Sequence, residues 1–202
     1  MKKILLTSCG IIGDTLVTEF KKLFDKEMSE LKLLYIPVAA YGEDGDKSWL
    51  DEEIVTILDL GIKKENILEY NMDYDLDINA FDAIYMMGGN TEYLLKMMRK
   101  YNFSIKIQEA INYGVLYIGS SAGSMVLGTN IYASNTFFPD EKRWLKDDEL
   151  DALNIFNGSI IPHFQKKDKR KVERFKNSHP NKVYGIDDEH AILIIDDLIR
   201  EL

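Results

Sequence analysis

The stretch "YIGSSAGSMVL", residues 117–127, joins an apolar run to a cluster of small residues. The apolar run predicts a buried strand, and the small residues after it predict a tight turn into a helix. Such a turn can be a compact connection only, or it can push one hydroxyl group out into a pocket. Residues 119–123 match the pattern G-x-S-x-G, in which a strained strand-to-helix turn exposes the serine. The stretch therefore indicates an α/β fold and makes Ser121 a candidate nucleophile.

Apolar strands and helical segments alternate along most of the chain. We expect strands at residues 4–7, 31–38, 67–70, 81–87, 115–118, 155–161, 183–186 and 191–195. We expect helices at residues 16–24, 47–60, 92–99, 105–113 and 167–177, where apolar residues recur at helical spacing. Strands that are apolar throughout and separated by helices imply a mostly parallel sheet covered on both faces. The prediction is an α/β three-layer sandwich, with residues 1–202 as a single domain.

The composition excludes several classes of protein. The 202 residues carry a net charge of −9, which disfavours a nucleic-acid groove because phosphate binding needs clustered Lys and Arg. Cys9 is the single cysteine, so no intrachain disulfide can form and a reducing compartment is expected. The N-terminal apolar run is too short for a signal peptide, and no run reaches the length of a membrane span. We expect a cytoplasmic protein, either a monomer or a homodimer, with no nucleic-acid or membrane partner.

Backbone N–H groups near Ser121 are candidate oxyanion donors. The residue after the nucleophile usually offers its N–H to the developing oxyanion, which points to Ala122. Gly88 and Gly89 end the neighbouring predicted strand, and a backbone without Cβ can approach a substrate closely. Gly119 and Gly123 stand two residues either side of Ser121, where a Cβ would clash between strand and helix. These positions extend the candidate site from one hydroxyl to a pair of strand ends.

A serine nucleophile needs a base, and the chain offers three histidines. His163 follows an apolar strand that we expect to end on the same edge of the sheet as Ser121. His179 lies at a helix end and is expected to be an exposed loop residue, and His190 is less well placed because it precedes a strand. His163 is therefore the expected base.

The third member of a triad would be a carboxylate that orients the imidazole. The segment "YGIDDEHAIL" offers Asp187, Asp188 and Glu189, and chemistry alone does not choose among them. The order Ser…His…acid differs from the Ser…acid…His order of α/β-hydrolases, which disfavours an ordinary esterase.

Four segments together resemble one family. They are "IYMMGGNTEYLLKMM" at residues 84–98, "LYIGSSAGSMV" at 116–126, "DALNIFNGSIIPHF" at 151–164 and "VYGIDDEHAILI" at 183–194. Their order and spacing resemble those of the serine peptidases that include aspartyl dipeptidase (dipeptidase E) and cyanophycinase. The resemblance implies a flavodoxin-like fold similar to the class I glutamine amidotransferase domain, and a serine-type peptidase that acts on small peptides without a metal or cofactor.

The resemblance also implies roles for particular residues. Asp188 takes the position of the triad acid, where the family usually carries Glu, so Glu189 is a reserve candidate. Asn135 is followed by Thr136 where the aspartyl dipeptidases carry an acidic residue, which puts the preference for an N-terminal aspartate in doubt. The implied set is Ser121, His163 and Asp188 as catalytic residues, Gly89, Ala122 and Gly88 as oxyanion donors, and Asn90 and Asn135 as substrate-binding residues.

Other functions remain open from the sequence. A catalytically inactive, amidotransferase-like domain could bind a small amino-acid ligand or a partner, because fold does not determine function. The segment "SCGIIGD" at residues 8–14 resembles a phosphate loop but lacks G-x-G-x-x-G and the P-loop lysine. Cys9 is expected to be a small buried apolar residue. Arg170 and Lys171 could meet a substrate carboxylate, although a solvated helix face accounts for both.

Overall fold

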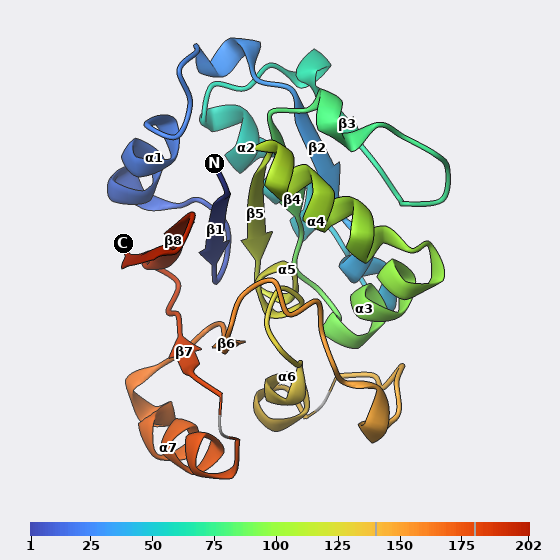
Figure 1. The fold of residues 1–202 in the computed structure, drawn as a ribbon, viewed down its shortest axis with the longest axis vertical. Helices are drawn as coiled ribbons and strands as arrows, with labels where there is room; N and C mark the ends of the chain where they lie inside the picture. Colours follow the sequence, from blue (N-terminus) through green and yellow to red (C-terminus); the bar gives the residue numbers. More distant parts are fainter. Residues whose placement is uncertain (140, 180) are drawn as a thin grey trace.

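A seven-stranded central sheet forms the middle layer of the molecule (Figure 1). The computed structural model describes residues 1–139, 141–179 and 181–202. The strand order is β3-β2-β4-β5-β1-β8-β9, with parallel pairing from β3 to β1 and antiparallel pairing of β8 with β1 and β9. The strands are β1 (Lys3–Thr7), β2 (Leu33–Ile36), β3 (Ile67–Glu69), β4 (Ala83–Met86), β5 (Leu116–Ser120), β8 (Ala191–Ile195) and β9 (Leu198–Glu201). The predicted mostly parallel α/β sheet is confirmed.

Helices cover both faces of this sheet, which explains why its strands are apolar throughout. Leu5 of β1 packs in one cluster with residues of α1 (Gly13–Lys21) and α2 (Trp49–Asp59). Leu6 packs in a second cluster, on the other face, with residues of α3 (Thr91–Lys100) and α4 (Phe103–Tyr113). Successive residues of a strand point to opposite faces, so each strand contributes to both cores.

A second, two-stranded parallel sheet pairs β6 (Ser159–Ile161) with β7 (Val183–Gly185). It lies with α6 (Tyr132–Phe137) and α7 (Lys169–Ser178) beyond the carboxyl ends of β1 and β5 (Figure 1). We expected the strand before His163 to end on the same sheet edge as Ser121, but β6 is not part of the central sheet. The physical reason is that β8 already pairs with the free side of β1.

The remaining elements are short. A single helical turn, α5 (Ala122–Met125), follows β5. The 3-10 helices are η1 (Met28–Glu30), η2 (Val38–Gly42), η3 (Lys64–Asn66), η4 (Ile78–Ala80), η5 (Asp147–Glu149) and η6 (Lys166–Asp168). Among the described residues, no helix has the length and apolar character needed to cross a membrane.

Candidate active site

Ser121 occupies a strained turn between β5 and α5. Its backbone has φ +46° and ψ −106°, a conformation that residues with a side chain rarely adopt. The Ser121 N–H donates a hydrogen bond to the carbonyl oxygen of Thr7, at the end of β1, over 3.2 Å. The bond and the sharp turn together hold the Ser121 hydroxyl beyond the carboxyl end of the sheet.

Two glycines make this turn possible, as the sequence predicted. A Cβ on Gly119 would lie 2.7 Å from the carbonyl carbon of Gly123, and a Cβ on Gly123 would lie 2.8 Å from the carbonyl carbon of Met86. Ser124 adds a polar link, because its Oγ lies 2.8 Å from the carbonyl oxygens of both Thr7 and Gly119. The turn is therefore packed directly against the ends of three strands.

His163 contacts the Ser121 hydroxyl group. The distance between Ser121 Oγ and His163 Nε2 is 3.1 Å. His163 follows β6 and has a positive φ of 54°, so its backbone, like that of Ser121, is in a sparsely populated conformation. The ring of Phe138 meets the imidazole edge-on, with 6.1 Å between the ring centres. These contacts fix the imidazole between the serine and the turn that precedes β8.

Asp188 lies on the other side of the imidazole. His163 Nδ1 and Asp188 Oδ1 are 2.9 Å apart. Partial burial raises the pKa of Asp188, but the hydrogen bond from Ser8 and the neighbouring His163 outweigh burial, so the pKa lies below its usual value. Asp188 is therefore ionised at neutral pH and can accept a hydrogen bond from the imidazole N–H.

Ser8 is part of this arrangement, and the sequence analysis missed it. Its hydroxyl donates to Asp188 Oδ1 over 2.6 Å and accepts from the backbone N–H of His163 over 2.7 Å. Ser8 follows β1 directly, so it lies at the carboxyl end of the central strand. That position is the available signal, because residues at the carboxyl ends of parallel strands gather at one edge of the sheet.

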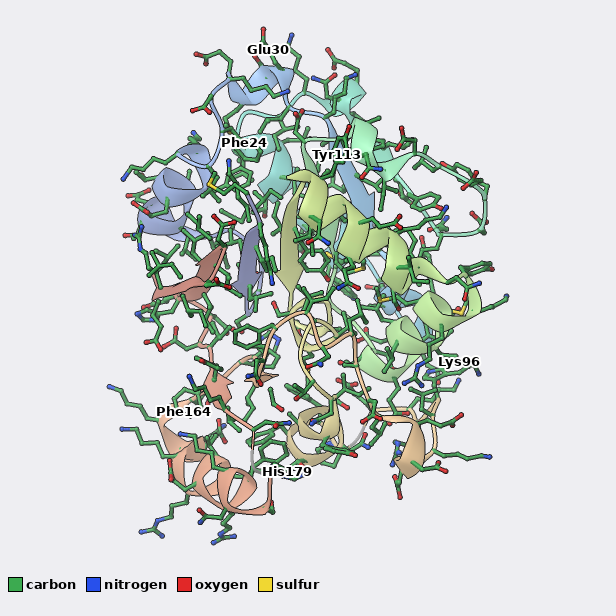
Figure 2. All side chains as sticks on the ribbon, viewed as in Figure 1. Phe24, Glu30, Lys96, Tyr113, Phe164 and His179 are labelled. Atoms are coloured by element: carbon green, nitrogen blue, oxygen red, sulfur yellow. The ribbon has the colours of Figure 1, made fainter. Side chains whose placement is uncertain are left out.

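The other acids and histidines contact different groups. Asp187 pairs with His190, with 2.5 Å between Oδ1 and Nδ1, and this hydrogen bond lowers the pKa of Asp187. Glu189 is exposed. His179 lies at the end of α7 (Figure 2). Its ring stacks on the ring of Phe175, with 4.0 Å between the ring centres. Among the described residues, Asp188 is thus the carboxylate in contact with the His163 ring.

The candidate oxyanion donors surround Ser121. A Cβ on Gly88 would lie 3.2 Å from the Cβ of Ser121. Gly89 has φ +125°, and a Cβ there would lie 2.6 Å from the backbone of Ala39 and Ala40. Among the described residues no acceptor contacts the Gly89 N–H, and the N–H of Ala122 has no partner within its helix because it is the first helical residue. Both N–H groups are thus available to a ligand.

Asn90 and Asn135 have structural partners rather than places in the cavity beside Ser121. The Asn90 side chain is buried, caps α3 by accepting the Tyr93 N–H over 2.9 Å, and donates to the Lys142 carbonyl over 2.8 Å. The Asn135 amide fits between Glu92 Oε1 at 2.9 Å and an Arg143 nitrogen at 3.2 Å. Direct substrate contact through these two side chains is therefore not favoured by the structure.

A cavity of about 310 Å³ opens beside Ser121 and His163. Gly88 and Gly89 line it, together with two aromatic residues, Trp49 and Phe138, and three acidic residues, Glu43, Glu53 and Glu141. A larger hollow of about 490 Å³ lies on the far side of Asp188, but neither Ser121 nor His163 lines it. The smaller cavity is therefore the place where a group attacked by Ser121 would sit.

Cys9 lines this cavity and is half-buried, so the expectation of a fully buried apolar residue is wrong. Its Sγ donates to the Asp188 carbonyl oxygen at 3.4 Å. Burial and the charge of Asp188 raise the pKa of Cys9 to about 12. The thiol therefore stays protonated at neutral pH, which disfavours it as a nucleophile. Among the described residues, no three His, Cys, Asp or Glu side chains are placed to bind one metal ion.

Comparison with known proteins assigns the family. The profile of peptidase family S51 matches residues 4–202. An uncharacterized peptidase of Listeria monocytogenes is 28% identical over 204 residues, which cover 96% of this chain and 95% of the relative. Peptidase E of Shewanella sp. (strain ANA-3) is 30% identical over 162 residues, which cover 79% of this chain and 66% of the relative.

Solved structures share the fold. The crystal structure of a candidate peptidase E protein from Listeria monocytogenes superimposes with a TM-score of 0.79 at 24% identity, over 100% of this chain and 98% of the other. A peptidase from an acI-B1 actinobacterium gives a TM-score of 0.68 at 20% identity, over 100% of this chain and 94% of the other. By the family match over nearly its whole length, the chain belongs to peptidase family S51 and is a peptidase.

Proposed function

We propose that this peptidase hydrolyses small peptides through a triad of Ser121, His163 and Asp188. The observation that carries the proposal is the continuous contact from Ser121 Oγ to His163 Nε2 at 3.1 Å and from His163 Nδ1 to Asp188 Oδ1 at 2.9 Å. A base within hydrogen-bond reach of a serine, itself oriented by a carboxylate, is the arrangement that activates a hydroxyl group.

The chemistry follows from the atoms in contact. His163 Nε2 takes the proton of Ser121 while Oγ attacks the peptide carbonyl carbon, and Asp188 stabilises the imidazolium that forms. In this proposal the N–H groups of Gly89 and Ala122 stabilise the oxyanion. When the C–N bond breaks, His163 gives its proton to the leaving amine, and an acyl group stays on Ser121. Water, deprotonated by the same imidazole, then releases the acid.

A substitution of the nucleophile tests the mechanism. Purified protein is incubated with a panel of dipeptides, including Asp-Leu because the family that the sequence resembles includes aspartyl dipeptidase. Ser121→Ala should lower kcat by at least about 10⁴-fold, since the remaining groups cannot form the acyl intermediate. Ser178→Ala, a serine at the end of α7, is the control and should keep full activity. Hydrolysis that survives Ser121→Ala would refute the mechanism.

A covalent probe gives an independent answer. A sulfonyl fluoride should label the wild-type protein once, at Ser121, and peptide mass spectrometry locates the adduct. Wild-type protein that stays inert to the probe and to every peptide would instead indicate a ligand-binding domain without catalysis.

A further inference from the structure

The cavity beside Ser121 is acidic. Its three acidic lining residues come from separate parts of the chain: Glu43 follows η2, Glu53 belongs to α2, and Glu141 precedes the η5 region. No Lys or Arg is among the described residues that line the cavity. A peptide that presents its carbonyl group to Ser121 must therefore place neighbouring atoms close to negative charge.

These carboxyl groups lack the partners that usually compensate buried acids. None of the three forms an ion pair with a cation within the described ranges. Burial raises the pKa of Glu43, and the charge of Lys47 offsets only part of that rise. Glu53 accepts a hydrogen bond from the buried Tyr85 hydroxyl. Burial, together with the charges of Glu43 and Glu92, raises the pKa of Glu141 to about 7. Partly buried carboxylates without a cation are costly, and a bound cation would relieve that cost.

Two aromatic rings line the same cavity. Trp49 begins α2 and Phe138 follows α6, and both side chains are half-buried. Aromatic faces attract ammonium and guanidinium groups through their quadrupole, and they offer nothing to a carboxylate. Carboxylates and aromatic rings around one small space form the usual surroundings of an organic cation.

We propose that this cavity binds an ammonium group of the peptide substrate next to Ser121, and that Glu43, Glu53 and Glu141 select for it. The inference rests on the proposed function, because it concerns the substrate of the same nucleophile. Two sources supply this chemistry: the α-ammonium of an N-terminal residue, and the side chain of a lysine whose carbonyl is attacked. An aspartate side chain in the cavity would meet Glu43, Glu53 and Glu141, whose carboxyl groups repel it in their ionised forms.

A set of peptides separates these sources. Ala-Leu, Lys-Leu, Asp-Leu, acetyl-Ala-Leu and acetyl-Lys-Leu are compared by kcat/KM. Acetyl-Ala-Leu, which has no cation, should fall about tenfold or more below Lys-Leu, the loss expected for one charged hydrogen bond. If the side chain is the recognised group, acetyl-Lys-Leu keeps its rate; if the α-ammonium is, acetyl-Lys-Leu falls with acetyl-Ala-Leu. Equal rates for all peptides, or Asp-Leu as the fastest, would overturn the inference.

Variants assign the selectivity to the carboxylates. Glu43→Gln and Glu141→Gln should each reduce the ratio of kcat/KM between Lys-Leu and acetyl-Ala-Leu several-fold, because each removes a negative charge without changing shape. Asp44→Asn is the matched control: it removes a charge next to Glu43 from an exposed residue that does not line the cavity, and it should keep the ratio. A ratio unchanged in both Gln variants would contradict the assignment.

A binding measurement makes the test independent of turnover and of the Gln variants. Calorimetry with the Ser121→Ala protein should show Lys-Leu binding about tenfold more tightly than acetyl-Ala-Leu. If the wild-type protein shows neither hydrolysis nor labelling, the proposed mechanism is wrong. If hydrolysis depends on Ser121 but its rate does not depend on the charge of the peptide, only the inference about selectivity is wrong. Equal binding of the two peptides would overturn it in either case.

Discussion

Ser8 connects two members of the proposed triad through one hydroxyl group. It donates to the Asp188 carboxylate and accepts from the His163 backbone, so it fixes the acid and the base relative to each other. It does not contact the Ser121 hydroxyl and is therefore a positioning residue.

We predict that Ser8→Ala lowers kcat about tenfold, the effect expected for one hydrogen bond to a charged group. Because that bond lowers the pKa of Asp188, its loss should raise this pKa. Steady-state kinetics measure kcat, and NMR titration of the Asp188 carboxyl group measures its pKa. Ser8→Thr keeps the hydroxyl and should restore both; a lower kcat with an unchanged Asp188 pKa would show only a loss of packing.

The raised pKa of Glu141 makes the free energy of unfolding depend on pH. The folded-state pKa of about 7 lies above the ordinary value of 4.5, so the folded protein holds this proton more tightly than the unfolded chain does. Glu141 therefore reduces the free energy of unfolding as the pH rises from about 4.5 to about 7, and the loss stays constant above that. Glu43 and Glu92, which face Glu141, act in the same direction.

Glu141→Gln should accordingly stabilise the protein at pH 8 by about 1 kcal/mol, after discounting for the part of the side chain that water screens. The gain should vanish below about pH 4.5, where the wild-type carboxyl group is protonated in both states. Urea unfolding at several pH values measures it. A gain that is the same at pH 4 and pH 8 would show that the charge is not its origin.

Sequence reasoning at this scale succeeded where a residue carries a local signature. Ser121 sits in a five-residue pattern and His163 follows a buried strand, and the structure brings both together, although their catalytic roles stay a prediction. Ser8 has no such pattern, because its partner Asp188 lies 180 residues away in the chain. The acidic residues of the cavity likewise come from segments that lie far apart in the chain, so no local sequence pattern indicates them.

At the scale of elements, the turn after β5 depends on close contact between backbones. Gly123 lies so near the end of β4 that any side chain would push α5 away from the sheet.

Gly123→Ala should therefore reduce the free energy of unfolding by about 2–3 kcal/mol, the range for overpacking a tight site, and should lower activity because Ser121 moves with α5. Chemical denaturation measures the loss. Gly13→Ala is the control: it has a positive φ but open space around it, so we expect a loss of about 1 kcal/mol. Equal losses in the two variants would mean that crowding at Gly123 is unimportant.

Elements were predictable where periodicity was strong. The expected segments agree with the structure to within a few residues at each end for strands β1, β2, β4 and β5 and for helices α1 to α4. The strand β9 was missed because its four residues are all exposed and show no buried alternation. The helix α6 was missed as well, since its six residues are too few to show a helical repeat of apolar residues.

At the scale of the whole molecule, β1 organises the site. It pairs with β5, which leads to Ser121, and with β8, which the Asp188 turn precedes. Outside β8 lies β9, whose pairing continues to Leu202 through two hydrogen bonds with Ala191.

Removal of residues 197–202 should lower the melting temperature by roughly 5 °C, because β8 loses the ladder that covers its outer edge. Activity at 25 °C should fall as well, since β8 holds the turn that carries Asp188. Differential scanning calorimetry and a peptide assay measure the two effects. Leu198→Lys is the control, because that side chain is 62% exposed and points to solvent. A truncated protein with full activity would show that β9 does not support the turn.

The central position of β1 also bears on biosynthesis. The strand β1 is synthesised before both of its neighbours, which follow more than 100 residues later, and β8 ends only at Ile195. Until that segment has left the ribosome, β1 has no partner on one of its sides, and the turn that carries Asp188 has no sheet to hold it. The residues of the proposed triad can therefore assemble only after translation of this region is finished.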